Sequence, residues 1–154
     1  MIIAKKSSFF RQRYTIMDDE RTLAKIKLNS FREQADITID GLVITIKKKS
    51  AFKSDYELDV NGNPLAFANK LSLWKYDTLI KVSDQEFLLK RANWFSSNMA
   101  VIYSGRQIGL IKKRGWFTSD VIADLPASIP IELRIFMLII KLFYRNRDAA
   151  AASS

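Results

Sequence analysis

The sequence predicts a mainly β protein: an antiparallel closed barrel of about twelve strands, built from three repeats and enclosing a hydrophobic C-terminal α-helix. Three observations lead to this prediction. Short alternating runs of apolar and polar residues fill the chain before Leu125, separated by turn residues. Similar pairs of runs recur at a spacing of about 43 residues. The most apolar stretch of the chain then follows, near the C-terminus.

The clearest pair of strands is ADITI-DG-LVITI, residues 35–46. Asp-Gly between two alternating runs favours a hairpin, because a type I′ turn needs positive φ at both central residues. The side chains that face each other on one side of this hairpin would be Ala35 and Ile46, Ile37 and Ile44, and Ile39 and Leu42. This register is self-consistent, since it leaves residues such as Thr38 and Thr45 on the opposite face.

Two further hairpins resemble each other: YELDV-NG-NPLAF turns at Asn61-Gly62, and MAVIY-SG-RQIGL turns at Ser104-Gly105. A two-residue turn without irregularity predicts the pairs Leu58–Leu65, Tyr56–Phe67, Val101–Ile108 and Met99–Leu110. YTIMDDERTLAKI is a weaker upstream copy, and other strand pairs alternate with these hairpins. Each repeat would then supply four strands.

A repeat of this length with four strands also describes a propeller blade. Three blades are fewer than propellers use, and the Gly-His and Trp-Asp motifs of such blades are absent from the sequence. A barrel is the better interpretation, because closing the sheet removes its exposed edges.

The apolar stretch IPIELRIFMLIIKLFYR, residues 129–145, is predicted to be the central helix, at about 129–146. Ser128 and Pro130 favour a helix start there, as a capping hydroxyl and a first-turn residue. The uninterrupted apolar run is Ile135–Ile140, too short for a bilayer span, which needs about 20 residues. Apart from a narrow stripe of Arg134, Lys141 and Arg145, most of the helix surface is apolar, which favours enclosure inside the barrel. We expect a single domain at 1–147 and a disordered tail at 148–154.

The composition excludes several kinds of chemistry. Cysteine is absent, which excludes disulfides, thiolate metal sites and thiol nucleophiles. Histidine is also absent, which excludes the usual nitrogen ligand of metals and every catalytic Ser-His or Cys-His pair. No motif indicates a catalytic residue, metal site or cofactor, so we expect a non-enzymatic protein. The 25 Lys and Arg against 16 Asp and Glu give a net charge of +9, which favours an anionic partner or serves solubility alone.

The hairpins YELDVNGNPLAFA and VIYSGRQIGLIKK, followed by VIADLPASIPIELRIFMLIIKLFYR, resemble the tubby C-terminal-like superfamily, which includes LURP-one-related proteins and phospholipid scramblases. The resemblance covers about residues 9–145 and looks most like the compact single-domain members. It implies a twelve-stranded barrel around a central hydrophobic helix. It also implies a function at membranes, since tubby domains bind phosphoinositides and scramblases are associated with lipid movement. No lipid-contacting residue of the family can be matched to a position of this chain.

Two basic runs are the candidate ligand-binding residues for an anionic headgroup: Lys47, Lys48, Lys49 and Lys53, and Lys112, Lys113 and Arg114. The second run precedes Trp116 and Phe117, and aromatic residues beside cations suit a membrane interface. Both runs could equally be solvated loops. Four aromatic residues could stack on nucleic-acid bases: Trp74, Tyr76, Trp94 and Phe95. Core or barrel-rim positions are also open for them, and nucleic acid is not an expected partner.

The sequence therefore favours a binding module that recognises anionic phospholipid or phosphoinositide headgroups at a membrane surface. The alternative is a scaffold that interacts with an unknown protein partner and has neither a lipid nor a nucleic-acid ligand. With no secretory signal and no transmembrane span in the sequence, we expect a cytoplasmic protein that attaches peripherally to an anionic membrane.

Overall fold

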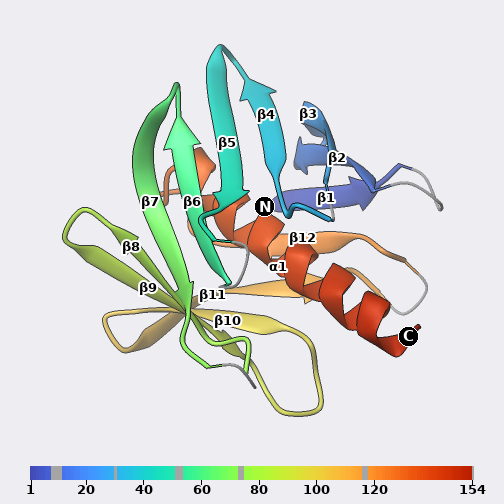
Figure 1. Ribbon diagram of the computed structural model, residues 1–154, viewed down its shortest axis with the longest axis vertical. Helices are drawn as coiled ribbons and strands as arrows, with labels where there is room; N and C mark the ends of the chain where they lie inside the picture. Colours follow the sequence, from blue (N-terminus) through green and yellow to red (C-terminus); the bar gives the residue numbers. More distant parts are fainter. Residues whose placement is uncertain (8–11, 30, 51–53, 73–74, 116–117, 154) are drawn as a thin grey trace.

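In the computed structural model, twelve antiparallel strands form one sheet that curves around a single C-terminal helix, α1 (Figure 1). The structure describes residues 1–7, 12–29, 31–50, 54–72, 75–115 and 118–153. The strands are β1 (Ile2–Lys6), β2 (Arg13–Asp18), β3 (Arg21–Lys27), β4 (Ala35–Ile39), β5 (Leu42–Lys48), β6 (Asp55–Val60), β7 (Asn63–Lys70), β8 (Thr78–Val82), β9 (Gln85–Arg91), β10 (Met99–Tyr103), β11 (Arg106–Lys113) and β12 (Val121–Asp124). The helix α1 spans Ile131–Ala152.

The barrel is nearly closed rather than fully closed. The order of the strands is β3-β2-β1-β12-β11-β10-β9-β8-β7-β6-β5-β4, so β3 and β4 form the two edges of the sheet. In the described part of the chain, backbone pairing between these edges is limited to the bridge Asn29–Gln34 beside their connection. The predicted antiparallel barrel of about twelve strands around the C-terminal helix is confirmed, with β3 and β4 meeting only at this bridge in the described residues. An ion pair between Arg21 and Asp40, 2.9 Å from Nη2 to Oδ2, joins the turns at the other end.

The two ends of the barrel differ in their connections. Each even-numbered strand from β2 to β10 is joined to the next strand by only two residues, and we call this side the tight-turn end. Each odd-numbered strand is joined to the next by a longer connection, and these connections lie together at the long-loop end. The helix enters after β12 at the tight-turn end, and its last turns leave at the long-loop end (Figure 1).

The hairpin predicted at residues 35–46 is confirmed. β4 and β5 pair Ala35 with Ile46, Ile37 with Ile44, and Ile39 with Leu42. Asp40 and Gly41 have φ of 47° and 82°, as a type I′ turn requires. The inward residues of β4 are buried and Thr38 between them is exposed, because alternate side chains point to opposite faces of the sheet.

The predicted registers of the other two hairpins are wrong by one residue. Leu58 lies opposite Ala66, and Val101 lies opposite Gly109, because a β-bulge follows each two-residue turn. The same shift occurs between β2 and β3. The bulge turns Leu65 outward and places Ala66 in the core, where it is fully buried. The common bulge is compatible with three repeats, which stay a prediction from the sequence.

The helix begins after Pro130, which is its N-cap residue and makes no side-chain capping bond. The predicted capping role of Ser128 is therefore wrong, since Pro130 leads directly into the helix with extended backbone angles. At the other end the helix continues to Ala152, beyond the expected end near residue 146 and into the predicted tail. The alanines of this segment favour helix, because alanine loses no side-chain entropy there.

The middle of α1 is enclosed. Every residue from Ile135 to Tyr144 is buried, and the helix packs at the centre of the main hydrophobic core. Side chains from the sheet, such as Ile44, Leu58 and Val101, complete that core. Within the described residues, no helix is long and apolar enough to cross a membrane. The interpretation of the apolar stretch as an interior element is confirmed.

We expect Leu138→Asp or Ile139→Asp to unfold the domain. Each side chain is fully buried in the described structure, and an unpaired carboxylate there would lower the free energy of unfolding by more than about 4 kcal/mol. Circular dichroism during heating measures the effect. Ala150→Asp, on an exposed turn of the same helix, is the control and should keep the wild-type melting temperature. A folded Leu138→Asp protein would contradict the buried position of the helix.

Gly109→Ala tests the bulged register. A Cβ atom at Gly109 would lie 2.5 Å from both the backbone oxygen of Asp124 and Cδ2 of Leu125. Because the backbone there cannot easily move, we expect the free energy of unfolding to fall by about 1–3 kcal/mol. Gly115→Ala is the control, since a Cβ there meets no atom within 4 Å. Equal stability of the two variants in urea denaturation would argue against the bulge.

Candidate anion-binding surface at the long-loop end

The first predicted basic run is largely paired within the protein. Lys47 Nζ lies 3.2 Å from Asp59 Oδ2 and 4.0 Å from Glu57 Oε2, both on the neighbouring strand β6. Lys48 Nζ lies 3.6 Å from Glu33 Oε1, and Lys49 Nζ lies 4.6 Å from the centre of the Phe67 ring. Lys53 lies outside the described residues. These partners offset much of the charge that the run would otherwise offer to a ligand.

The second predicted run lies at the end of β11. Lys112 is half-buried, Lys113 is exposed and has its own contacts, and Arg114 Nη1 lies 3.8 Å from Asp120 Oδ2. Trp116 and Phe117 lie outside the described residues. The structure does not bring the two runs together. Both are at the long-loop end, but β10, β9, β8, β7 and β6 lie between β11 and β5, which places the runs on opposite sides of the barrel.

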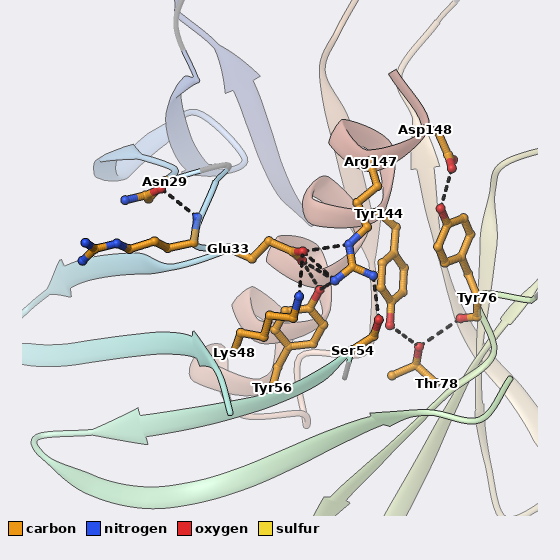
Figure 2. A network of polar contacts seen from close by, with 11 residues as sticks. Asn29, Glu33, Lys48, Ser54, Tyr56, Tyr76, Thr78, Tyr144, Arg147 and Asp148 are labelled. Atoms are coloured by element: carbon orange, nitrogen blue, oxygen red, sulfur yellow. Dashed lines mark hydrogen bonds and ion pairs between the residues drawn. The ribbon is translucent and has the colours of Figure 1, made fainter. Parts of the chain in front are cut away.

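A polar network closes the long-loop end around the last turns of α1 (Figure 2). Arg147 binds the carboxylate of Glu33 through two nitrogens: Nε is 2.8 Å from Oε1, and Nη2 is 2.8 Å from Oε2. Tyr56 donates its hydroxyl to Glu33, and Arg147 Nη1 donates to Ser54 Oγ at 2.7 Å. Burial, followed by the bond to Glu33, raises the pKa of Tyr56. This network ties the helix to β6 and to the connection between β3 and β4.

Glu33 reaches this network through an unusual backbone conformation. Its φ of 51° lies in the left-handed region, which residues with side chains rarely adopt. The carboxylate is nevertheless buried, with 8% of the residue exposed, and is bound by both Arg147 and Lys48. The favourable charge-assisted bonds offset the local strain.

A second set of contacts holds the opposite side of the helix end (Figure 2). The hydroxyls of Thr78 and Tyr144 are 2.6 Å apart, and the Tyr76 hydroxyl donates to Asp148 Oδ1 at 2.5 Å. The rings of Tyr76 and Tyr144 stack with centroids 4.5 Å apart. Burial raises the pKa of Tyr76 and of Tyr144 to about 12, so both hydroxyls stay protonated at neutral pH. Asp148 therefore anchors a helix turn that the sequence had placed in a disordered tail.

Sequence reasoning missed this network because its members are distant in the chain. Glu33 and Arg147 are 114 residues apart, and neither belongs to a recognisable motif. Arg147 also lies just beyond the predicted end of the helix near residue 146, so the apolar stretch gave no reason to expect a buried partner for it.

Two residues of the basic helix stripe also reach the long-loop end. Lys141 is buried, with 6% of the residue exposed, and its Nζ donates to the backbone oxygen of Ser97 in the β9–β10 connection. Burial lowers the pKa of Lys141 to about 8; Asp148 acts in the opposite direction, and Arg145 and Arg91 reinforce the decrease. Arg145 donates to the backbone oxygen of Ser119 at 2.5 Å and to the Tyr14 hydroxyl at 2.8 Å.

Large apolar side chains project from the long loops into solvent. Phe31 in the β3–β4 connection is 98% exposed, and Trp94 and Phe95 in the β9–β10 connection are 78% and 83% exposed. Leu71, after β7, is also exposed. Of the alternatives for Trp94 and Phe95, the rim position is the one observed. Trp74 lies outside the described residues. Trp94 and Phe95 are adjacent, with ring centroids 4.2 Å apart, and contiguous exposed apolar residues mark interaction surfaces more often than single exposed side chains do.

Comparisons with protein-family models, with curated proteins and with solved structures found no match for this chain. The resemblance to tubby-like proteins stays a prediction. Among the residues that the structure describes, no group of acidic side chains is arranged to hold a metal ion. The arrangement at the long-loop end offers cations, hydrogen-bond donors and exposed aromatic rings.

Lys141 should make the stability of the domain depend on pH. Its folded pKa of about 8 lies below the ordinary 10.5, so between these values the unfolded chain binds more protons and stability rises with pH. We expect the free energy of unfolding of the wild type to rise by about 2 kcal/mol relative to Lys141→Met between pH 7 and 10. Urea denaturation at a series of pH values measures this difference.

The comparison with Lys141→Met removes contributions that both proteins share, such as those of Lys70 and the tyrosines. The raised pKa values of Tyr76 and Tyr144 have the opposite effect, but only above about pH 10, where an unfolded tyrosine begins to ionise. Parallel stability curves for the two proteins from pH 7 to 10 would contradict the buried, charged state of Lys141.

Proposed function

We propose that this protein is a non-enzymatic module that attaches peripherally to an anionic membrane surface through its long-loop end. The observation that carries the proposal is the position of the exposed aromatic residues Phe31, Trp94 and Phe95 at the same end of the barrel as most of the basic side chains.

The charges of the barrel are unevenly distributed between its ends. The tight-turn end carries an excess of acidic residues in and beside its turns: Asp18, Asp19, Glu20, Asp40, Asp84, Glu86 and Asp124. The long-loop end carries an excess of basic residues: Lys27, Arg32, Lys49, Lys75, Lys90, Arg91, Lys113 and Arg114, with Arg145 and Arg147 of the helix. A field of this polarity orients the long-loop end toward an anionic surface during approach.

The exposed aromatic residues of the long loops, Phe31, Trp94 and Phe95, which we call the apolar tips, supply the second component of binding. Aromatic residues favour the boundary between headgroups and acyl chains, and each basic residue near an anionic bilayer contributes about 1 kcal/mol. Phe31 is followed by Arg32, and Trp94 follows Arg91 at the end of β9, so both tips have a cation beside them. Shallow insertion of the tips with cations at the headgroup level satisfies both kinds of side chain.

The site differs from the one that the sequence favoured. Lys47 and Lys48 face internal carboxylates, so reversing their charge would disturb the β5–β6 pair and the Glu33 network before it affected any ligand. The exposed cations Lys27 and Arg32 and the exposed rings of the long loops are better placed to meet a membrane.

We expect Lys27→Glu with Arg32→Glu to weaken binding to vesicles of phosphatidylcholine and phosphatidylserine at least about tenfold, because both residues lie at the long-loop end. Flotation at low and high salt measures binding. Lys81→Glu with Arg106→Glu changes the net charge equally at the tight-turn end and should have a much smaller effect. Equal losses in the two double variants would contradict an oriented attachment.

The apolar tips are tested in the same assay. Phe31→Ser with Phe95→Ser should reduce binding even at low salt, whereas Val43→Ser with Leu65→Ser, at the tight-turn end, should not. If the wild type binds neither neutral nor anionic vesicles, the proposal fails and the scaffold with a protein partner becomes the better explanation of the exposed rings.

A further inference from the structure

The outer face of β8, β9 and β10 carries a row of three large apolar side chains. Leu79 lies opposite Leu88, and Leu88 lies opposite Ile102, so the row crosses three neighbouring strands. The next residues along the strands, Ile80 and Leu89, are fully buried in the core, which places the row on the outside of the barrel. All three side chains of the row are half-buried. This face of the sheet therefore has a partly exposed apolar centre.

The apolar row lines a shallow groove of about 520 Å³. The β8–β9 turn, at Asp84, and the β10–β11 turn, at Ser104 and Gly105, line the same groove on the side of the tight-turn end. Small-molecule sites enclose most of their ligand, whereas this groove is open. An open surface with a contiguous apolar centre is more typical of contact with another protein.

Charged residues flank the row on both sides. On β9, Glu86 lies two residues before Leu88 and Lys90 lies two residues after it, and alternate residues of a strand share a face. On β8 the order of charges is reversed. Lys81 lies opposite Glu86 on the tight-turn side of the row, and Asp77 lines a cleft with Lys90 on the long-loop side. In the described part of the chain, these four charged side chains form no ion pair.

A second copy of this chain fits the pattern when it lies face to face with its strands reversed. A twofold axis along the apolar row then places each apolar side chain against the same residue of the other copy. The operation also brings Glu86 of one copy beside Lys90 of the other, because both lie two residues from the axis. Lys81 of one copy meets Asp77 of the other in the same way. Every charge that flanks the row thus gains a partner of opposite sign.

The neighbouring strand β7 favours this antiparallel arrangement over a parallel one. Asn69 lies opposite Leu79, so Phe67 and Leu71 lie at equal distances on either side of the axis. Reversing the second copy brings Phe67, 37% exposed, toward Leu71, 57% exposed. A parallel copy would also pair opposite charges, but it would place Ile102 against Asn69. Only the reversed copy matches apolar residues with apolar residues.

The ends of the barrel contribute in the same direction. Reversal places the acidic tight-turn end of one copy beside the basic long-loop end of the other. The net charge of +9 opposes self-association through long-range repulsion. At an ionic strength of about 0.15 M this repulsion is screened beyond about 8 Å, whereas side chains in contact still attract each other.

We propose that two copies of this chain form an antiparallel homodimer through the outer face of β8, β9 and β10. The apolar row lies at the centre of the interface, and the Glu86–Lys90 and Lys81–Asp77 pairs flank it. The long-loop ends of the two copies then point in opposite directions. This inference does not rest on the proposed membrane attachment, because the interface is on the side of the barrel rather than at its end.

The test exchanges charges across the proposed interface and measures association by sedimentation equilibrium of the full chain, without lipid, at about 0.15 M salt. Glu86→Lys brings lysines together across the interface, and Lys90→Glu brings carboxylates together. We expect each variant alone to associate at least about tenfold more weakly than the wild type. An equimolar mixture of the two variants should regain the wild-type affinity, because the lysines of one variant then face the glutamates of the other.

The control variants are Lys25→Glu and Asp36→Lys, which reverse one charge of each sign on the edge strands β3 and β4, on the other side of the barrel. Each should associate as tightly as the wild type. Leu88→Ser changes no charge and should also weaken association. A wild type that stays monomeric at millimolar concentration, or equal losses in the control variants, would overturn the proposal. A mixture that stays dissociated would also overturn it, since a parallel dimer places Glu86 against Lys81 and is not rescued.

The outcome is separate from that of the membrane function. Association is measured without vesicles, and flotation is measured with them. A dimer that floats with no vesicle would refute the membrane function and keep the interface. Vesicle binding by a chain that stays monomeric would do the reverse.

Discussion

The rest of the structure depends on the burial of α1 inside the twelve-stranded sheet. A barrel of this many strands has an interior wider than its own side chains can fill. An amphipathic helix with a broad polar face could not fill it without burying charges. The apolar circumference of α1 meets this requirement, and residues Ile135 to Tyr144 are buried. From the strands, Tyr56 stacks on Phe143 of the helix with ring centroids 5.4 Å apart, and Ala66 and Ala68 are fully buried in the same core.

The same constraint explains why the two ends of the barrel differ. A helix that enters at the tight-turn end must bring its polar C-terminal residues out through the long-loop end. There Arg147 and Asp148 are bound by Glu33 and Tyr76, so the helix end closes the barrel with polar contacts (Figure 2). Because the helix end covers the core, the long loops can project exposed aromatic and basic side chains into solvent. The proposed membrane attachment uses these exposed side chains.

Features that depend on residues close together in the sequence were predicted, whereas features that depend on residues far apart in the sequence were not. The β4–β5 hairpin was predicted with its register because the Asp-Gly turn and the strand alternation are local. The registers at Leu58 and Val101 were missed, because a bulge follows each turn and the hairpin pattern does not show it; the close approach of Gly109 to Asp124 and Leu125 is a contact with the next strand and the residue that follows it. The two predicted basic runs lie at the ends of β5 and β11, but the pairing of their residues with Glu33, Asp59 and Asp120 required knowledge of neighbouring segments.

The sequence by itself determined the class of fold, because apolar alternation, tight turns and an apolar helix are periodic features of consecutive residues. It also determined what chemistry is missing, since histidine and cysteine are absent. Only the tertiary structure decided which charges are available. Lys47 and Lys75 look alike in the sequence, but one lies beside two carboxylates on β6 and the other lines an open cleft. The physical reason is that a cation is neutralised by residues near it in space, and those residues are brought there by the barrel.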